Sequence, residues 1–299
     1  MTVVSKIAPQ FRRAAILYVP GSDERKVAKA FTHKTVDTRV LDLEDSVTIQ
    51  KKSLARSIVC KTLANIPPQS NNSIVQETCV RINSVTSGLA ESDLAAILPF
   101  NSLDSILVPK VNSASDIHFI QSVIAQHRSN TNIKILVGIE SAKGLINLPH
   151  IIDASNIGTA NDAGVDFKRR QGQIEALVFA AEDYAADLGL IRTPERTEML
   201  FARQMVVTHA VANGLQAIDL VCVDFKNESV LRKECREGRT FGFTGKQAIH
   251  PDQVEIIQSC FLPSEIELKY AARILAEAGK YSGQGVGAFE LDGKMIDAV

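Results

Sequence analysis

The amino-acid sequence predicts an α/β protein folded as a (β/α)8 TIM barrel with a C-terminal extension that holds a helix and a hairpin. Eight runs rich in apolar and β-branched residues alternate with helix-like stretches, over the roughly 250 residues that such a barrel requires. Continuous apolar runs of this kind are typical of parallel strands that are buried on both faces. An open, doubly wound sheet is the competing architecture, and the count of eight favours the barrel.

The eight expected strands are the apolar runs, and the helices between them have readable ends. Ser113 and Asp116 form a capping signal ahead of a helix over Ile117–His127. Gly214 closes a helix over Met199–Ala212. In chain order, the expected strands are Ala14–Val19, Arg39–Leu43, Cys79–Ile82, Ser105–Val108, Ile133–Ile139, Ala176–Ala181, Ala217–Val223 and Arg239–Phe243.

Three regions follow from this pattern: an N-terminal segment at 1–13, a barrel catalytic domain at 14–262 and a C-terminal extension at 263–299. The extension is expected to contain a helix at Ser264–Ala278 and a hairpin that turns at Asp292-Gly293. Between them lies the glycine-rich stretch Gly283–Gly287, which follows a helix and not a strand. A flexible tether therefore fits it better than a dinucleotide-binding loop.

Composition excludes several classes of function. Lys+Arg total 33 against 34 Asp+Glu, a net charge of -1, so nucleic acid is a poor default partner. The longest apolar run, Ala176–Ala181, is far shorter than the roughly 20 residues of a membrane helix, and we expect no membrane partner. Five dispersed cysteines with no CxxC pair argue against a disulfide framework and a zinc site.

Polar side chains stand where most of the expected strands end, which in a barrel is where catalytic groups project. Glu140 and Asp183 end neighbouring strands, and two carboxylates with open positions between them suit Mg²⁺. The competing interpretation is that each acid caps the next helix. Arg81 ends the third strand, where its guanidinium could hold a carboxylate or thioester oxygen bidentately. A surface salt bridge is its alternative role. The other polar groups at strand ends are Tyr18, Glu44, Asp45, Asn83, Lys110, Glu182, Asp219 and Asp224, with Lys246 and His250 expected beyond the eighth strand.

Five motifs resemble, in order, those of the citrate lyase β-subunit-like family, part of the aldolase/citrate lyase superfamily. Further stretches, Val80–Leu94 and Gly214–Val223, together with the ending Gly293–Asp297, look most like that family's mitochondrial citramalyl-CoA lyase branch. The resemblance spans nearly the whole chain. The five motifs are Leu17–Gly21, Leu41–Asp45, Val80–Ser84, Leu107–Val111 and Phe241–Gln247.

The resemblance implies roles for particular residues. Glu140 and Asp183 match the family's magnesium ligands, and Arg81 and Tyr18 match groups that contact substrate. Arg25 stands where close relatives have a lysine that contacts coenzyme A. Asp297 matches a catalytic aspartate that a neighbouring subunit of a homotrimer supplies. Glu44 and Asp45 are expected to orient waters around the metal.

The expected activity is therefore Mg²⁺-dependent cleavage of citramalyl-CoA, or a malyl-CoA-type thioester, with Arg81 and Asp297 as catalytic residues. One alternative is a CoA-independent aldolase for 2-oxo-4-hydroxy acids, and another is a non-catalytic scaffold subunit. The resemblance implies a mitochondrial location, with the cytoplasm as the alternative. Lys6, Arg12 and Arg13, with no acidic residue before Asp23, are only weakly similar to a presequence.

Overall fold

A computed structural model describes residues 11–67, 76–127, 133–155, 172–282 and 288–297. The chain divides into two compact units, one that ends at Phe261 and one that begins at Leu262. Within the described residues, no helix is both long and apolar enough to span a membrane.

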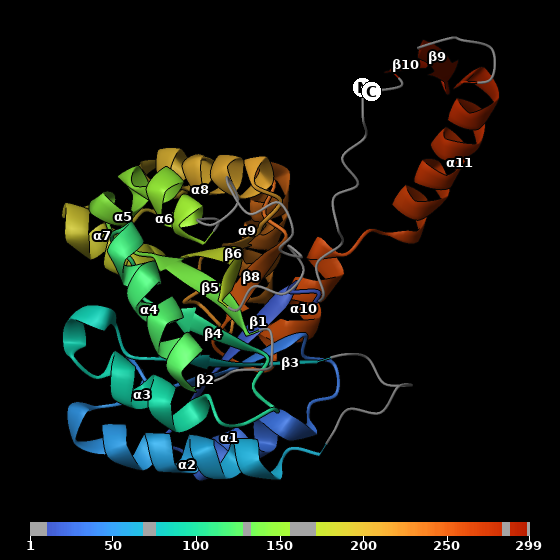
Figure 1. Ribbon diagram of the computed structural model, residues 1–299. Helices are drawn as coiled ribbons and strands as arrows, with labels where there is room; N and C mark the ends of the chain where they lie inside the picture. Colours follow the sequence, from blue (N-terminus) through green and yellow to red (C-terminus); the bar gives the residue numbers. More distant parts are fainter. Residues whose placement is uncertain (1–10, 68–75, 128–132, 156–171, 283–287, 298–299) are drawn as a thin grey trace, which may run out of the picture. The chain divides into compact units, whose positions relative to one another are not determined.

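The first unit is a closed barrel of eight parallel strands in sequential order, surrounded by helices (Figure 1). This architecture confirms the expected (β/α)8 barrel and excludes the open sheet. Seven of the expected strands overlap the observed ones, with ends shifted by up to four residues. The strands are β1 Ala15–Pro20, β2 Thr38–Asp42, β3 Glu77–Arg81, β4 Ser105–Val108, β5 Lys134–Ile139, β6 Gln173–Phe179, β7 Gln216–Asp219 and β8 Gly245–Ala248.

The helices cover the barrel and bury an apolar layer between themselves and the outward-facing strand residues. Their ends follow local chemistry: the Asp116 carboxylate accepts from the Asn112 and Ser113 backbone N–H groups at 2.9 Å, and Gly214 has a φ of 69° just beyond α8. The helices are α1 Glu24–Thr32, α2 Lys52–Asn65, α3 Ala90–Ile97, α4 Ala114–His127, α5 Ala142–Ile146, α6 Leu148–Ala154, α7 Ala181–Leu188, α8 Leu200–Ala212, α9 Glu228–Phe241 and α10 Gln253–Phe261.

The eighth strand was expected at Arg239–Phe243, and this prediction was wrong. Residues up to Phe241 belong to α9, and the strand is Gly245–Ala248. Its four residues, GKQA, carry no apolar run, so periodicity could not reveal them. Gly245 fits because a Cβ there would lie 1.8 Å from the Arg13 carbonyl oxygen. Lys246, expected after the strand, is a fully buried residue within it.

Alternation along the strands positions the site. One apolar cluster fills the barrel interior, and it includes Ile16, Val40 and Cys79. Because strand side chains alternate between faces, the residues two positions later also point inward. These are Tyr18, Asp42 and Arg81, at the carboxyl ends of β1, β2 and β3.

A buried ionic network closes the amino-terminal end of the barrel. The Arg13 guanidinium, with no exposed surface, donates to Glu77 at 2.5 and 2.7 Å and to Gln216 at 2.6 Å. It also pairs with Glu175 at 2.8 Å. Phe11 and Arg13, expected in an N-terminal segment, are therefore buried in the barrel unit.

The second unit contains α11 Glu265–Ser282 and a hairpin of β9 Ala288–Leu291 and β10 Lys294–Asp297. Asp292 and Gly293 make the turn with φ angles of 53° and 75°, as a two-residue hairpin loop requires. The Arg273 guanidinium pairs with the Asp292 carboxylate at 2.7 and 2.8 Å, which ties the turn to α11. The expected tether at 283–287 lies outside the described residues.

Candidate active site

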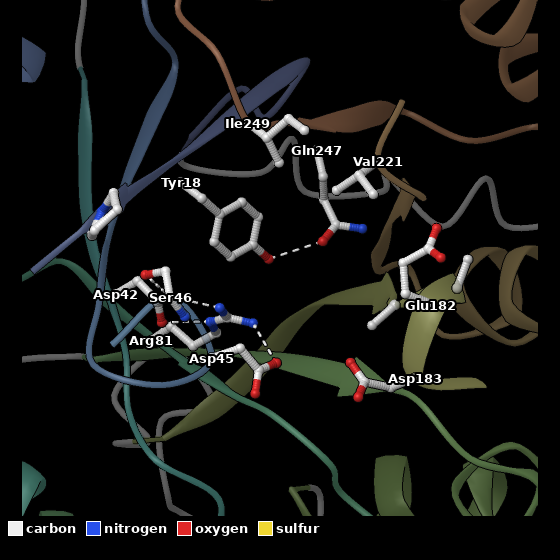
Figure 2. Close-up of a pocket in the computed structure, with 13 residues that line it drawn as sticks. Tyr18, Asp42, Asp45, Ser46, Arg81, Glu182, Asp183, Val221, Gln247 and Ile249 are labelled. Carbon is white, nitrogen blue, oxygen red and sulfur yellow. Dashed lines mark hydrogen bonds and ion pairs between the residues drawn. The ribbon is translucent and has the colours of Figure 1, made fainter. Parts of the chain in front are cut away.

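The carboxyl ends of the strands surround a cavity of about 360 Å³. Figure 2 shows Arg81 between Asp42 and Asp45, with Tyr18 and Gln247 on one side and Asp183 beyond Asp45. The cavity brings together Tyr18, Asp45, Arg81 and Asp183, which were expected to share a site. It is also lined by Asp42 and Gln247, which were not.

Glu140 and Asp183 have the character of cation ligands. Glu140 is 4% exposed, and its Oε2 has no hydrogen-bond partner among the described residues. Burial, and then the negative charges of Glu44 and Asp183, raise the pKa of Glu140 to about 8. A buried carboxylate oxygen without a donor, close to a second carboxylate, is a place where a hard cation compensates both charges. The residues present therefore fit Mg²⁺.

Neither of these two acids is a helix N-cap, since α7 has Ala180 at that position. The N-cap of α5 is Ser141, whose Oγ accepts from the Gly144 N–H at 3.0 Å, so Glu140 is not a cap. Asp183 does lie in the first turn of α7. Among the described residues, no cluster of three or more His, Cys, Asp or Glu side chains has metal-binding geometry. A two-carboxylate site suits Mg²⁺, which keeps several waters or substrate oxygens.

Gly138 leaves the space that the Glu140 carboxylate occupies. A Cβ at position 138 would lie 2.5 Å from Glu140 Oε1 and 3.2 Å from the Pro109 Cα. Gly138 and Glu140 are two positions apart at the end of β5, so both face the interior. The missing side chain therefore lets Glu140 fold back over the strand end.

Arg81 uses one bidentate edge within the protein, and its contact with a substrate stays a prediction. Its Nε and Nη2 each donate to the Asp42 carboxylate at 2.6 Å. The guanidinium also lies 4.9 Å from the centre of the Tyr18 ring. Nη1 lies 3.1 Å from Glu44 Oε2 and 3.6 Å from Asp45 Oδ2. The N–H groups of Nη1 and the second N–H of Nη2 are the donors that Arg81 can still offer a substrate, together with its positive charge.

Glu44 and Asp45 follow β2 and share a second cation, Lys110. The Lys110 ammonium donates to Glu44 Oε1 at 2.6 Å and to Asp45 Oδ1 at 3.1 Å. Lys110 adopts a φ of 54°, a left-handed conformation that is uncommon outside glycine. Burial opposes the shift, but Glu44 and Asp45 raise the pKa of Lys110, so this residue stays cationic beside the acids.

A second cavity of about 250 Å³ adjoins the first, because both are lined by Tyr18, Pro20 and Ile249. Lys26 and Lys29, from α1, and His250 line the second cavity. The His250 ring stacks on Phe225 with centroids 5.2 Å apart. The structure thus places two lysines where a long anionic ligand could extend from the first cavity.

Two residues that the sequence predicts at the site, Arg25 and Asp297, are not among the residues that line the two cavities. Arg25 is on the exposed face of α1 and lines neither cavity. Asp297 ends β10, in the second compact unit, and its side chain is exposed. The roles of both residues stay predictions.

Sequence reasoning missed Asp42, Gln247, Lys26 and Lys29. Asp42 could have been found by its inward alternation with Val40. Gln247 donates to the Phe179 and Asp219 carbonyl oxygens at 2.9 and 3.0 Å and accepts from Tyr18 at 3.0 Å. That role was hidden because β8 was misplaced.

The chain is similar to several characterised proteins. It is 38% identical to the mitochondrial citramalyl-CoA lyase of Homo sapiens, over 95% of this chain and 81% of the relative. It is 33% identical to citrate lyase subunit beta of Haemophilus influenzae, over 96% of this chain and 92% of the relative. The crystal structure of CitE from Mycobacterium tuberculosis, in complex with magnesium, acetoacetate and coenzyme A, superposes with a TM-score of 0.70 and 26% identity, covering 96% of this chain and 94% of that one.

The family model for HpcH/HpaI aldolase/citrate lyase matches residues 14–251, which include every strand of the barrel and both candidate cation ligands. Together with the relatives above, this match shows that the chain belongs to the HpcH/HpaI aldolase/citrate lyase family.

Proposed function

We propose that this protein is a Mg²⁺-dependent carbon–carbon lyase that cleaves citramalyl-CoA to acetyl-CoA and pyruvate. The observation that carries the proposal is a cavity lined by the Asp183 carboxylate and the fixed Arg81 guanidinium, with the buried Glu140 carboxyl, one oxygen of which has no partner among the described residues, in electrostatic contact with both. The relative from Homo sapiens bears the name of this activity, and the superposed CitE structure holds magnesium and coenzyme A.

Glu140 and Asp183 would hold the cation. When bound, Mg²⁺ supplies Lewis-acid polarisation of the tertiary hydroxyl and its neighbouring carboxylate. Glu44 and Asp45, fixed by Lys110 and Arg81, would orient waters at the remaining positions.

Arg81 and Asp297 would act on the fragment that leaves. As the bond between the carbinol carbon and the thioester α-carbon breaks, its electron pair forms a thioester enolate, and the hydroxyl loses its proton to become the keto group. Arg81 Nη1 would stabilise the negative charge on the enolate oxygen. Asp297 of a neighbouring subunit would protonate the enolate carbon. A water oriented by Glu44 and Asp45 would accept the hydroxyl proton, and solvent would supply the proton that Asp297 delivers, so proton loss and proton gain balance.

The second cavity would take the coenzyme A part of the substrate. Lys26 and Lys29 line it, and ammonium groups attract the phosphates of coenzyme A. It meets the first cavity at Tyr18 and Ile249, so a thioester could lie across both. Arg25, on the same helix, would add positive charge at the mouth. A free 2-oxo-4-hydroxy acid would leave this second cavity without a role.

The relatives also suggest a location. The citramalyl-CoA lyases of Homo sapiens, Mus musculus and Rattus norvegicus are all named mitochondrial. We propose the mitochondrion for this protein, as a homotrimer in which the C-terminal extension reaches a neighbouring subunit's site.

The decisive experiment measures acetyl-CoA release from citramalyl-, malyl- and methylmalyl-CoA, with and without EDTA. We expect citramalyl-CoA to be cleaved fastest and EDTA to abolish turnover until Mg²⁺ is restored. Cleavage of free 2-oxo-4-hydroxy acids alone would favour a CoA-independent aldolase, and no cleavage of any of these compounds would favour a scaffold subunit.

A further inference from the structure

We propose that Asp42 is a positioning residue that fixes the plane of the Arg81 guanidinium, so that its remaining N–H donors, on Nη1 and Nη2, keep one orientation in the cavity. The kinetic part of this inference rests on the proposed function. Its structural part, the fixed orientation of the guanidinium, does not. Nothing in the sequence pattern of strand ends drew attention to Asp42, because the acids that follow it, Glu44 and Asp45, are the ones nearer the loop.

The strand register brings the two residues together. Asp42 and Arg81 are paired positions on the neighbouring parallel strands β2 and β3, and both point into the barrel. Asp42 has no exposed surface, and its two oxygens each accept from Arg81 at 2.6 Å. Parallel, charge-assisted bonds of this kind fix the plane of the guanidinium as well as its position.

A second contact restricts the guanidinium. The Tyr18 ring lies 4.9 Å from Arg81 Cζ, and the Tyr18 hydroxyl donates to Gln247 Oε1 at 3.0 Å. Gln247 is itself anchored by two backbone carbonyl oxygens. Asp42 therefore holds one edge of the Arg81 guanidinium, and the Tyr18 ring lies against one of its faces.

Asp42 has no capacity left for a substrate. Its Oδ1 also accepts from the Glu44 N–H at 2.8 Å, and its Oδ2 accepts from the Ser46 N–H at 3.1 Å and from the Ser46 hydroxyl. With both oxygens engaged and the residue fully buried, any effect of Asp42 on turnover has to pass through Arg81 or through the loop that follows β2.

The arrangement explains why Asp42 should affect turnover. Asp42 occupies the Nε–Nη2 edge of the guanidinium, and the remaining N–H donors are on Nη1, which lies 3.1 Å from Glu44 Oε2, and on Nη2. Donors that are held in one direction stabilise charge that develops in the transition state without reorganising. Loss of the orientation should therefore lower kcat more than it raises KM.

Asp42→Asn tests this role with a matched control. The variant keeps the size of the side chain but replaces one acceptor with an amide donor, so the fork with Arg81 cannot form. The control is Asp219→Asn, because Asp219 is also fully buried and also makes a fork, to Arg203 at 2.7 and 3.1 Å. Asp219 does not line the cavity.

We expect both variants to lose thermal stability, but only Asp42→Asn to lose turnover. Its kcat for citramalyl-CoA should fall at least about tenfold, with KM changed less than about threefold, the pattern of a lost transition-state interaction. The kcat of Asp219→Asn should stay within about threefold of wild type. An equal loss of kcat in both variants would overturn the proposal, because it would show a general effect of a broken buried ion pair.

A double-mutant cycle shows whether Asp42 acts through Arg81. In an Arg81→Ala background, Asp42→Asn should change kcat by less than about threefold, because the group it orients is gone. Independent, multiplying losses would overturn the proposal. If Asp42→Asn does not fold, Arg81→Lys serves instead: it keeps one charged donor but cannot fork with Asp42, and wild-type kcat in that variant would be contrary to the inference.

Side-chain NMR separates failure of this inference from failure of the proposed function. In ¹⁵N-labelled protein, the Arg81 Nε–H signal is identified as the one that is absent in Arg81→Lys. In the wild type we expect this signal together with separate Nη1 and Nη2 signals, because rotation about the bonds from Cζ to the two Nη atoms is blocked. In Asp42→Asn, the Nη signals should merge. If the wild-type protein cleaves no thioester, the proposed function is wrong. The separate Nη signals would still show whether Asp42 fixes the orientation of the Arg81 guanidinium. Merged signals in the wild type would refute it.

Discussion

At the scale of single residues, the proposed cation site depends on two carboxylates, Glu140 and Asp183. Glu140→Gln and Asp183→Asn each remove a charged oxygen ligand but keep the shape of the side chain. We expect each to weaken Mn²⁺ binding, used as a probe for Mg²⁺ and followed by electron paramagnetic resonance, at least about tenfold. Without a divalent cation, Glu140→Gln should also raise the free energy of unfolding at pH 7, because a carboxyl whose pKa is raised by folding destabilises the folded protein above its unfolded pKa.

Circular dichroism and thermal melts would confirm that both variants fold. Wild-type Mn²⁺ affinity in either one would exclude that residue as a ligand.

The absence of a side chain at position 138 is as specific a requirement as the presence of Glu140. Gly138→Ala would place a methyl group 2.5 Å from Glu140 Oε1 and so displace the carboxylate. We expect about tenfold weaker Mn²⁺ binding by titration, with little change in KM for the thioester. Gly279→Ala is the control, since a Cβ there meets nothing within 4 Å. Equal Mn²⁺ affinity in the two variants would show that Glu140 adjusts without loss.

Lys29 and Arg25, both on α1, should contribute unequally to the binding of coenzyme A. Lys29 lines the second cavity and Arg25 does not, so Lys29→Ala should raise KM for the thioester more than Arg25→Ala does. In both variants kcat should change less than KM, the pattern of lost uniform binding. Steady-state kinetics with citramalyl-CoA measure this. Unchanged KM in Arg25→Ala would remove Arg25 from the site, and unchanged KM in both would exclude α1.

At the scale of elements, α8 and α9 are joined by a network of ion pairs. Glu237 on α9 pairs with Arg196 at 2.7 Å and with Arg203 on α8. Partial burial opposes the shift, but hydrogen bonds from the two arginines lower the pKa of Glu237. A carboxyl whose pKa is lowered by folding stabilises the protein above its unfolded pKa, and this stabilisation is lost as pH falls through the folded pKa.

Glu237→Gln should therefore lower the free energy of unfolding by about 1 kcal/mol at pH 7. The difference from wild type should persist down to about pH 5 and shrink below about pH 4.3, the ordinary pKa of glutamate. Urea denaturation at several pH values measures it. Glu228→Gln, at an exposed pair with Arg232 on the same helix, should change stability by less than about 0.5 kcal/mol. If the difference in free energy of unfolding between Glu237→Gln and wild type grows at acid pH, this reasoning is wrong.

At the scale of the whole molecule, the open question is which chain supplies Asp297. We expect Arg81→Ala and Asp297→Ala each to keep only a small residual activity when assayed separately, far below a quarter of wild type. If Asp297 acts in a neighbour's site around a closed ring, mixing, unfolding and refolding equal amounts should restore about a quarter of wild-type activity, because each intact site needs one chain of each kind in the correct order. Acetyl-CoA release measures the recovery.

The control for this experiment is co-purification of differently tagged chains, which shows that mixed oligomers form. Mixed oligomers without recovered activity would show that Asp297 does not act between subunits.

The barrel itself could be predicted because its strands are local patterns. Seven largely apolar runs marked seven strands, since parallel strands buried on both faces are rich in apolar residues. The exception was Gly245–Ala248, which is held by neighbours and by the close approach of Gly245 to the Arg13 backbone and not by its own hydrophobicity. The two-residue turn at Asp292-Gly293 was equally local, because its chemistry depends on only those two residues.

The sequence by itself determined which strand ends carry acids, cations and an aromatic ring, and so where the site lies. Only the tertiary structure decided how these groups pair. Asp42 and Arg81 are 39 residues apart, and nothing local shows that the first occupies the binding edge of the second. Likewise, Lys26 and Lys29, and not Arg25, line the second cavity. Side-chain direction and partner choice depend on strand register and burial, which contacts between distant segments establish.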